Sequence, residues 1–418
     1  MLGFCCVCAV AALMVTPGSQ AQTAQRPWPA TATRPASTLP AATATAPAVV
    51  VTVRTSDELR QAAATARAGT AIRLQPGTYA GGVFLKDVAG TAGAPIVIEA
   101  ADPKDPPVFM RRTDGLHLSA CSYVTIRNIV IRDSTVNGIN IDDGGRFEKS
   151  GRGIVLENVQ VFDVAADGNH DGIKLSGLTD FTLRNCRVEG WGGQAIDMVG
   201  CHRGLIEGCV VRGKKQSDNS NGIQAKGGSS DIVIRRCLIV DSGDRGLNIG
   251  GSTGEKFLRP LDAKSEARDI TVEQCIIVGC NAAAAFVGVD GATFRHNTIY
   301  MPRLWVFRIL QESRGARFIT SRDGRVERNI IVFGKLRRFI NIGDQTKPES
   351  FSFQANWWYC ADEPKASRPD LPSAEKSGVY GTDPQMEDPA KEKFTPREPK
   401  AAGYGSSARA TATSSAPA

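Results

Sequence analysis

The sequence predicts an all-β fold, a single-stranded right-handed parallel β-helix with a short N-terminal capping helix, and three observations support this prediction. A motif of an apolar residue, any residue, Asn or Cys, and an apolar residue recurs nine times at intervals of 22 to 38 residues. A second motif, Gly or Ala followed by apolar, polar and apolar residues, recurs between its copies. After residue 70 the chain carries many Gly, Asn and Asp turns and no strong helix signal. Irregular spacing with two-residue alternation fits stacked coils better than a propeller, whose blades need about 40 residues.

The two ends of the chain differ in composition from its middle. Residues 1–21 hold a short apolar stretch and a small-x-small cleavage site, which predict a signal peptide and a secreted or periplasmic protein. Residues 22–48 are mostly Ala, Thr and Pro, and residues 401–418 are mostly Gly, Ser, Ala and Thr. Such segments bury too little apolar surface to order themselves. We therefore expect a disordered linker, a β-helix domain over residues 49–400, and a disordered tail.

Both open ends of a β-helix need covering. Thr55 and Glu58 form a capping box, an Ala-rich stretch follows, and Gly69 stands where a helix C-terminus favours a left-handed residue. These residues predict one short helix that covers the first coil. We expect the non-repetitive region around Trp357 and Trp358 to close the other end.

The small polar residue of the first motif is expected to stack inside one corner of the solenoid as a hydrogen-bonded ladder, with coils about 4.8 Å apart. The ladder positions are Asn128, Asn158, Cys186, Cys209, Cys237, Cys275, Asn297, Asn329 and Asn356. We expect buried thiols at the Cys positions, because parallel Cβ atoms about 4.8 Å apart exceed the usual Cβ separation of a disulfide.

The second motif sends every second residue outward, so that stacked coils form columns on one exposed face. The central column is His117, Asn140, Lys174, Asp197, Gln224 and Asn248. Inserts at 143–152, 163–170, 213–220 and 252–268 are expected to wall this face and to make a groove for an extended ligand. The net charge of +7 permits an acidic polysaccharide as partner without implying nucleic acid. No apolar run after the leader is long enough to span a membrane. We also expect the protein to be a monomer.

Two lysines on this face are candidate catalytic residues. The column neighbours of Lys226 are Val199 and Gly250, which offer no counter-charge, and Arg245 is expected nearby. Repulsion from Arg245 would lower the pKa of Lys226 and suit it to act as a base near neutral pH. A solvated surface lysine is the alternative. Lys174 lies beside Asp197, so catalysis and a surface ion-pair ladder explain it equally well.

The segment from Asp167 to Asp171 contains two carboxylates, an amide and the imidazole of His170. Oxygen ligands at this spacing could hold Ca²⁺ through Asp167 and Asp171. An Asx-rich turn, in which Asp and Asn side chains bond the local backbone, explains the segment about as well.

The repeats, with GTY at 77–79 and AGTAGAPIVIEA at 89–100, resemble the pectin-lyase-like superfamily of right-handed β-helix proteins over about residues 50–360. The segment NGIQAKG, residues 221–227, resembles the catalytic coil of the chondroitinase B and alginate lyase family, which implies that Lys226 is the base. That family places acidic calcium ligands where this chain has Asn219 and Asn221, and an arginine where it has Gly250.

A second resemblance concerns residues 169–173, which are similar to the Asn-x-Asp-Gly-Ile segment of polygalacturonase-type hydrolases. Their next coil carries an Asp-Asp pair, and here it reads Gly193-Gln194.

The expected function is a lyase that cleaves a uronic-acid-containing polysaccharide by β-elimination. A cation such as Ca²⁺ neutralises the uronate, Lys226 removes the C5 proton, and Arg245, Asp197 and Lys174 complete the catalytic set. The expected substrate-binding residues are Asn140, Gln224, Asn248 and His170. The alternatives are a C5 epimerase using His170 and Asp171, a glycoside hydrolase, or a non-catalytic glycan-binding or surface protein.

Overall fold

The structure is a computed structural model of the chain, and it describes residues 49–213 and 221–407. The predicted signal peptide and linker, residues 1–48, lie outside the described residues. So do residues 214–220 of the expected insert and residues 408–418 of the expected tail. No helix in the described part is long and apolar enough to cross a bilayer.

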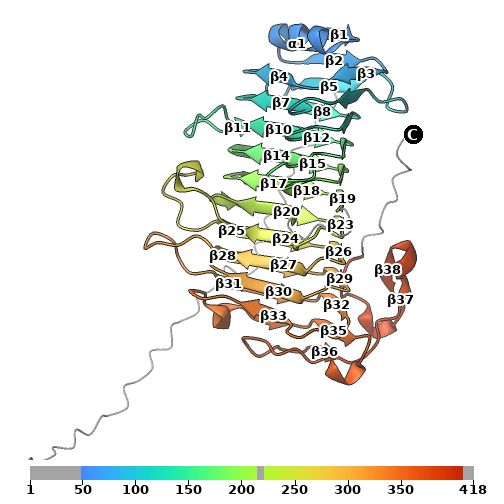
Figure 1. Ribbon diagram of the computed structural model, residues 1–418, viewed down its shortest axis with the longest axis vertical. Helices are drawn as coiled ribbons and strands as arrows, with labels where there is room; N and C mark the ends of the chain where they lie inside the picture. The colour runs from blue at the N-terminus through green and yellow to red at the C-terminus, as the bar shows by residue number, and fades with distance from the viewer. Residues whose placement is uncertain (1–48, 214–220, 408–418) are drawn as a thin grey trace, which may run out of the picture. The chain divides into compact units, whose positions relative to one another are not determined.

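The chain winds through three long parallel sheets, one strand of each per turn, as Figure 1 shows. Sheet A contains β1 (Val49–Val53), β2 (Thr70–Leu74), β5 (Ile96–Ala100), β8 (Val124–Arg127), β11 (Gly151–Arg152), β12 (Val155–Glu157), β15 (Leu178–Arg184), β18 (His202–Glu207), β21 (Ser229–Ser230), β22 (Val233–Arg235), β25 (Ala267–Glu273), β28 (Val289–Arg295), β31 (Arg322–Glu327) and β34 (Ser352–Gln354). Sheet B contains β3 (Thr78–Ala80), β6 (Val108–Met110), β9 (Val130–Arg132), β13 (Gln160–Phe162), β16 (Arg187–Glu189), β19 (Val210–Arg212), β23 (Leu238–Val240), β26 (Ile276–Val278), β29 (Thr298–Tyr300), β32 (Ile330–Phe333), β35 (Trp357–Cys360) and β36 (Val379–Tyr380). Sheet C contains β4 (Val83–Lys86), β7 (Leu116–Ser119), β10 (Ile139–Asp142), β14 (Ile173–Ser176), β17 (Gln194–Val199), β20 (Asn221–Lys226), β24 (Arg245–Gly250), β27 (Ala282–Val287), β30 (Trp305–Leu310) and β33 (Ile340–Ile342). The predicted all-β parallel solenoid is confirmed.

The inward residues of all three sheets form one continuous apolar core. Ile141, Leu175 and Ile223, for example, are fully buried on strands of sheet C, and polar residues alternate with them on the outer face. The two-residue alternation of each strand thus separates the core from the outer columns.

The internal ladder is confirmed at the C-terminal coils. The Nδ2 atom of Asn297 donates to Oδ1 of Asn329 at 3.1 Å, and that of Asn329 donates to Oδ1 of Asn356 at 2.8 Å. All three side chains are fully buried. They satisfy one another and the backbone at a corner that water does not reach.

The expectation for Asn128 and Asn158 is wrong by one residue. Both have left-handed backbones, with φ of 57° and 52°, and Asn158 Nδ2 bonds Asn128 Oδ1 on the outside of the solenoid. The buried corner position belongs to the next residue, Ile129 or Val159. Asn is favoured at the turn because it tolerates φ near +55°, whereas at the buried corner it is favoured for its hydrogen bonds.

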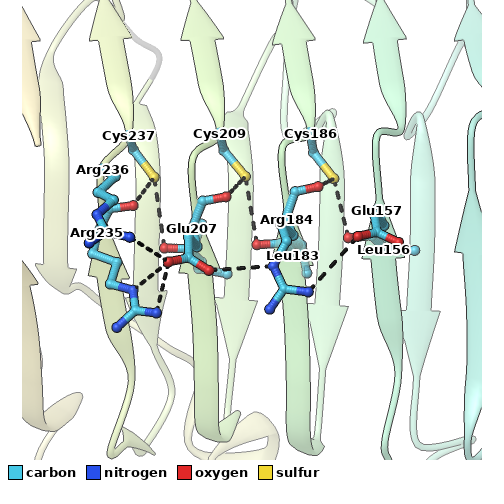
Figure 2. A network of polar contacts seen from close by, with 11 residues as sticks. Leu156, Glu157, Leu183, Arg184, Cys186, Glu207, Cys209, Arg235, Arg236 and Cys237 are labelled. Carbon is cyan, nitrogen blue, oxygen red and sulfur yellow. Dashed lines mark hydrogen bonds and ion pairs between the residues drawn. The ribbon is translucent and has the colours of Figure 1, made fainter. Parts of the chain in front are cut away.

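The corner cysteines are free, buried thiols, as expected. Figure 2 shows the sulfur atoms of Cys186, Cys209 and Cys237, each directed at a carbonyl of the preceding coil, at 3.6 to 3.8 Å. Outside the same corner, Glu207 accepts hydrogen bonds from Arg184 at 3.4 Å and from Arg235 at 2.7 Å.

Helix α1 (Ser56–Thr65) covers the first coil and buries Leu59 in the core. Thr55 accepts a hydrogen bond from Glu58 N, as the capping box predicts, and Glu58 accepts one from Arg54 N. The helix ends earlier than expected, because the C-cap is Ala66 in an extended conformation and not Gly69.

The expected C-terminal cap is wrong at Trp357 and Trp358, which are buried and form β35, a regular strand of sheet B paired with β32. Within residues 49–213 and 221–407, five 3-10 turns accompany the strands: η1 (Glu255–Phe257), η2 (Pro348–Ser350), η3 (Pro364–Ala366), η4 (Pro389–Lys391) and η5 (Pro399–Ala401).

After β36, the hairpin of β37 (Met386–Asp388) and β38 (Lys393–Pro396) packs on the outside of sheet B, where Arg212 pairs with Glu392. Ser406 N donates to Thr298 Oγ1 at 2.9 Å. The first residues of the expected tail, 401–407, are therefore packed against the solenoid.

Candidate functional site

The register of sheet C confirms the predicted central column. Residues from His117 through Lys174 and Asp197 to Asn248 pair one after another on neighbouring strands. The column continues through Ala285 and Arg308 to the last strand. Residues far apart in the sequence therefore lie side by side on the outer face of sheet C.

The middle of this column is a buried chain of hydrogen bonds. Gln224 Nε2 donates to Asp197 Oδ1 at 2.7 Å, and Asn248 Nδ2 donates to Gln224 Oε1 at 2.5 Å. Asp197, Gln224 and Asn248 have exposed fractions of 0%, 3% and 3%. The expectation that they line an open groove is wrong, because they bond one another.

Lys174 joins this chain through two carboxylates. Its Nζ atom lies 2.6 Å from Asp171 Oδ2 and 3.1 Å from Asp197 Oδ2. Burial disfavours its charge, but the two carboxylates outweigh burial and raise the pKa of Lys174 well above its ordinary value. Burial and the charge of Asp197 raise the pKa of Asp171, against the effect of Lys174. Lys174 is therefore held as an ammonium and does not accept a proton near neutral pH.

Arg245 lies at the other end of the chain of hydrogen bonds. Its guanidinium donates to Asn248 Oδ1 and Glu312 Oε1, both at 2.8 Å, and to Asp244 Oδ2 at 3.1 Å. Its register partner on β20 is Asn221, five residues before Lys226. At about 3.3 Å per residue these positions are roughly 16 Å apart along the strand. Arg245 therefore does not lie beside Lys226, and the expectation that the two cations are close together is wrong.

Lys226 ends strand β20 opposite Val199, as predicted, and its side chain is half-buried. Its ammonium makes no hydrogen bond or ion pair with any residue in the described ranges. Its carbonyl accepts hydrogen bonds from Gly200 N at 2.9 Å and from Ser229 Oγ at 2.6 Å. A Cβ added at Gly251 would lie 3.2 Å from Lys226 Cδ, so the side chain passes directly beside this glycine.

The inserts 143–152 and 252–268 project from the edge of sheet C at which β20 ends, as Figure 1 shows. A third insert at 311–321, which sequence analysis missed, is bonded to the insert 252–268 through Arg317, which donates to Glu255 and to the carbonyl of Leu261. The long interval between Asn297 and Asn329 was its signal in the sequence.

The buried side chain of Glu266 links the end of β20 to the inserts. Its fully buried carboxylate accepts hydrogen bonds from Gly227 N at 2.8 Å, from Thr253 N and Oγ1 at 3.0 and 2.7 Å, and from Ser313 Oγ. One side chain thus ties the residue after Lys226 to two of the inserts.

The expected calcium ligands are not brought together. Asp171 is fully buried and bonded to Lys174 and to Gln194 N, whereas Asp167 is exposed on the turn before β14. No group of three or more His, Cys, Asp or Glu side chains within residues 49–213 and 221–407 is arranged to hold a metal ion. The residues present do not fit the predicted calcium site.

The remaining predicted substrate-binding residues lie apart from Lys226. Asn140 is half-buried in the central column between His117 and Lys174. His170 is half-buried on the turn before β14, where its carbonyl accepts hydrogen bonds from Gly192 N and Gly193 N. Both are on sheet C coils that precede β20.

Comparison with known proteins gives a family match over residues 114–331, described as the right handed beta helix region, which is more than half of the chain. The chain belongs to this family. No curated protein matches the sequence.

Several solved structures of right-handed β-helix proteins share the fold. A rhamnogalacturonan lyase matches with a TM-score of 0.53 and 14% identity, over 75% of this chain and 84% of that chain. The pectate lyase Pel9A matches with a TM-score of 0.50 and 13% identity, over 73% and 80%. An alginate lyase from Paenibacillus sp. str. FPU-7 matches with a TM-score of 0.49 and 18% identity, over 71% and 97%. The first two likenesses show a common β-helix fold.

The structure also contains a cluster of three polar side chains, His117, Ser119 and Asp142, which sequence analysis did not connect. His117 Nε2 lies 2.6 Å from Asp142 Oδ2, and Ser119 Oγ donates to Asp142 Oδ1 at 2.7 Å. Burial raises the pKa of Asp142, but the hydrogen bonds from His117 and Ser119 overcome it and hold the pKa below its ordinary value. His117 and Ser119 lie one coil before Asp142 in the aligned outer columns. That alignment was the signal for this cluster in the sequence.

Proposed function

We propose that the protein is a polysaccharide lyase that cleaves a uronic-acid-containing polysaccharide, with Lys226 as the base. The observation that carries this proposal is the position of Lys226. It ends strand β20 beside Gly251, directly before the insert 252–268, and its ammonium makes no hydrogen bond or ion pair with any residue in the described ranges. The shared fold of two polysaccharide lyases is consistent with an extended sugar chain lying across the coils.

In the proposed reaction the amine nitrogen of Lys226 takes the C5 proton, which is acidic because it is α to the carboxyl group. The electron pair of the C5–H bond forms the C4–C5 double bond, and the C4–O glycosidic bond breaks. The leaving oxygen takes a proton from the lysine ammonium or from water. No metal step is included, because the described residues do not form the predicted calcium site.

The test compares Lys226→Ala with Lys86→Ala on alginate, pectate and chondroitin. Lys86 is a matched control, because it lies in the same column near the first coil and is exposed. Lys226→Ala should abolish the ultraviolet absorbance of the unsaturated product, and Lys86→Ala should retain it. Full activity in Lys226→Ala, or no product from the wild type with any polyuronate, contradicts the proposal.

A second candidate is a non-catalytic glycan-binding protein. The observation that favours it is that Lys174, Asp197 and Arg245 are all engaged in hydrogen bonds with other side chains. Binding of a polyuronate without turnover would support this candidate. The epimerase and hydrolase alternatives have less support, because Asp171 is fully buried and paired with Lys174.

We further propose export, with cleavage after the predicted signal peptide at residue 21, and a monomeric state. Mass spectrometry of the mature N-terminus tests the first proposal, and light scattering tests the second.

A further inference from the structure

Two inserts far apart in the sequence form one continuous wall beside Lys226. Arg259 Nε and Nη2 donate to the Asp143 carboxylate at 2.6 and 3.1 Å, across 116 residues. The side chains of Asp143 and Arg259 have exposed fractions of 1% and 11%. A buried two-pronged pair of this kind holds both inserts in a fixed geometry.

Glycine turns make this connection possible. A Cβ added at Gly177 would lie 2.7 Å from Arg259 Nε, and one added at Gly200 would lie 2.6 Å from Arg259 Cβ. The arginine therefore lies directly on the bare backbone after β14 and β17. It reaches from the insert after β24 to the insert after β10.

One exposed aromatic ring packs on this guanidinium, and a second exposed aromatic residue is bonded to it through its backbone carbonyl. Phe147, in the first insert, has its ring centroid 4.3 Å from Arg259 Cζ, and Arg259 Nη1 donates to the carbonyl of Phe257 at 3.0 Å. Phe147 and Phe257 have exposed fractions of 42% and 50%. Lys256 Nζ lies 5.0 Å from the centroid of the Phe257 ring. The wall thus offers two apolar ring faces next to cationic groups.

This aromatic pair is continuous with the end of β20. Arg259 N donates to the carbonyl of Gly227 at 2.9 Å, and Gly227 N donates to Glu266. Both backbone groups of the residue after Lys226 are therefore bonded to the second insert. The second insert is therefore hydrogen-bonded to the backbone directly beside the proposed base.

We propose that Phe147 and Phe257 form a binding subsite for the pyranose rings of an acidic polysaccharide, with Lys256 pairing with a uronate carboxylate. The inference rests on the proposed function for its choice of sugar. Aromatic faces bury the apolar C–H face of a sugar ring and leave its hydroxyl groups to water. A lysine over the ring gives the subsite a preference for a charged sugar over a neutral one.

The experiment measures binding by calorimetry in the Lys226→Ala protein, which prevents turnover. The ligands are hexasaccharides of alginate and galacturonate, with cellohexaose as the neutral comparison. Adding Phe147→Ala and Phe257→Ala should raise the Kd for the acidic hexasaccharide by about tenfold. Leu261→Ala is the matched control, because Leu261 is in the same insert and 52% exposed. It should leave the Kd unchanged.

Two further variants test the chemistry. Phe257→Trp should retain binding, and Lys256→Gln should weaken binding of the acidic hexasaccharide more than that of cellohexaose. Unchanged affinity in the double Phe variant, or no binding of any hexasaccharide to the Lys226→Ala protein, overturns the subsite. Production of unsaturated sugar by the wild type is a separate readout. The binding data can therefore overturn the subsite while the lyase function stands, and a lack of product can overturn the lyase function while the subsite stands.

Discussion

Arg245 begins strand β24 and Lys226 ends the neighbouring strand β20, so these two cations lie at opposite edges of sheet C. The guanidinium of Arg245 donates hydrogen bonds to Asn248, Glu312 and Asp244, whereas Lys226 lies beside Gly251 at the start of the insert 252–268. One cation belongs to a chain of buried hydrogen bonds and the other to the proposed site. Replacement of Arg245 should therefore affect mainly stability, and replacement of Lys226 mainly activity.

Arg245→Gln should lower the free energy of unfolding by about 1 to 3 kcal/mol, because it leaves Glu312 without a cation and Asn248 Oδ1 without its charged donor. Its kcat/KM should stay near that of the wild type. Urea unfolding and the product assay measure the two effects. Arg268→Gln is the control, because that side chain is 56% exposed, and its stability should change by no more than about 0.5 kcal/mol. A hundredfold loss of kcat/KM in Arg245→Gln at unchanged stability would place Arg245 at the substrate.

Lys174→Met should be among the most destabilising single changes, by about 3 to 5 kcal/mol, because it leaves the buried carboxylates of Asp171 and Asp197 unpaired. The pKa of Lys174 is raised on folding, so its contribution is fully present below the ordinary lysine pKa of about 10.4 and is lost as the pH rises through the folded value. The stability difference from the wild type should therefore be constant from neutral pH to about pH 10 and shrink above it. Adding Asp171→Asn and Asp197→Asn should recover part of the loss, and no recovery would contradict this account.

The sequence was sufficient to predict the register of the outer columns but not their burial. Strict two-residue alternation placed Asp197 opposite Lys174 and Lys226 opposite Val199, and both pairings are confirmed. Whether such a side chain faces water depends on its neighbours, and Asp197 is covered and bonded by residues 23 and 27 positions away.

The sequence motifs also did not determine where a residue lies along its strand, or whether it lies in a turn. The five-residue offset between Arg245 and Lys226 follows from the alignment of strands β20 and β24, and it places the two cations at different ends of neighbouring strands. Asn128 and Asn329 share a residue type, yet one stabilises a left-handed turn and the other an internal ladder. A motif defined by residue type cannot separate these roles when they fall on adjacent positions.

Asp142→Asn should reduce the acid dependence of stability. The folded pKa of Asp142 is held below its ordinary value of about 3.9, so its contribution is present above that value and is lost as the pH falls through the folded value. The difference in Tm between wild type and variant should accordingly be largest above about pH 4 and decline in more acidic buffer. Asp370→Asn, on an exposed loop, should show no such trend. A difference that grows on acidification would contradict the role of the His117 and Ser119 hydrogen bonds.

Asn329→Ala should cost about 3 kcal/mol in the free energy of unfolding, whereas Asn128→Gly should change it by no more than about 0.5 kcal/mol. Asn329 accepts from Asn297 and donates to Asn356, and its loss leaves buried polar groups on both neighbouring coils without partners. Asn128 lies at φ of 57°, a conformation that glycine adopts freely, and its side chain bonds only at the surface. Chemical denaturation of the two variants measures the contrast. Comparable losses in both would mean that the two asparagines share one role, contrary to their positions in this solenoid.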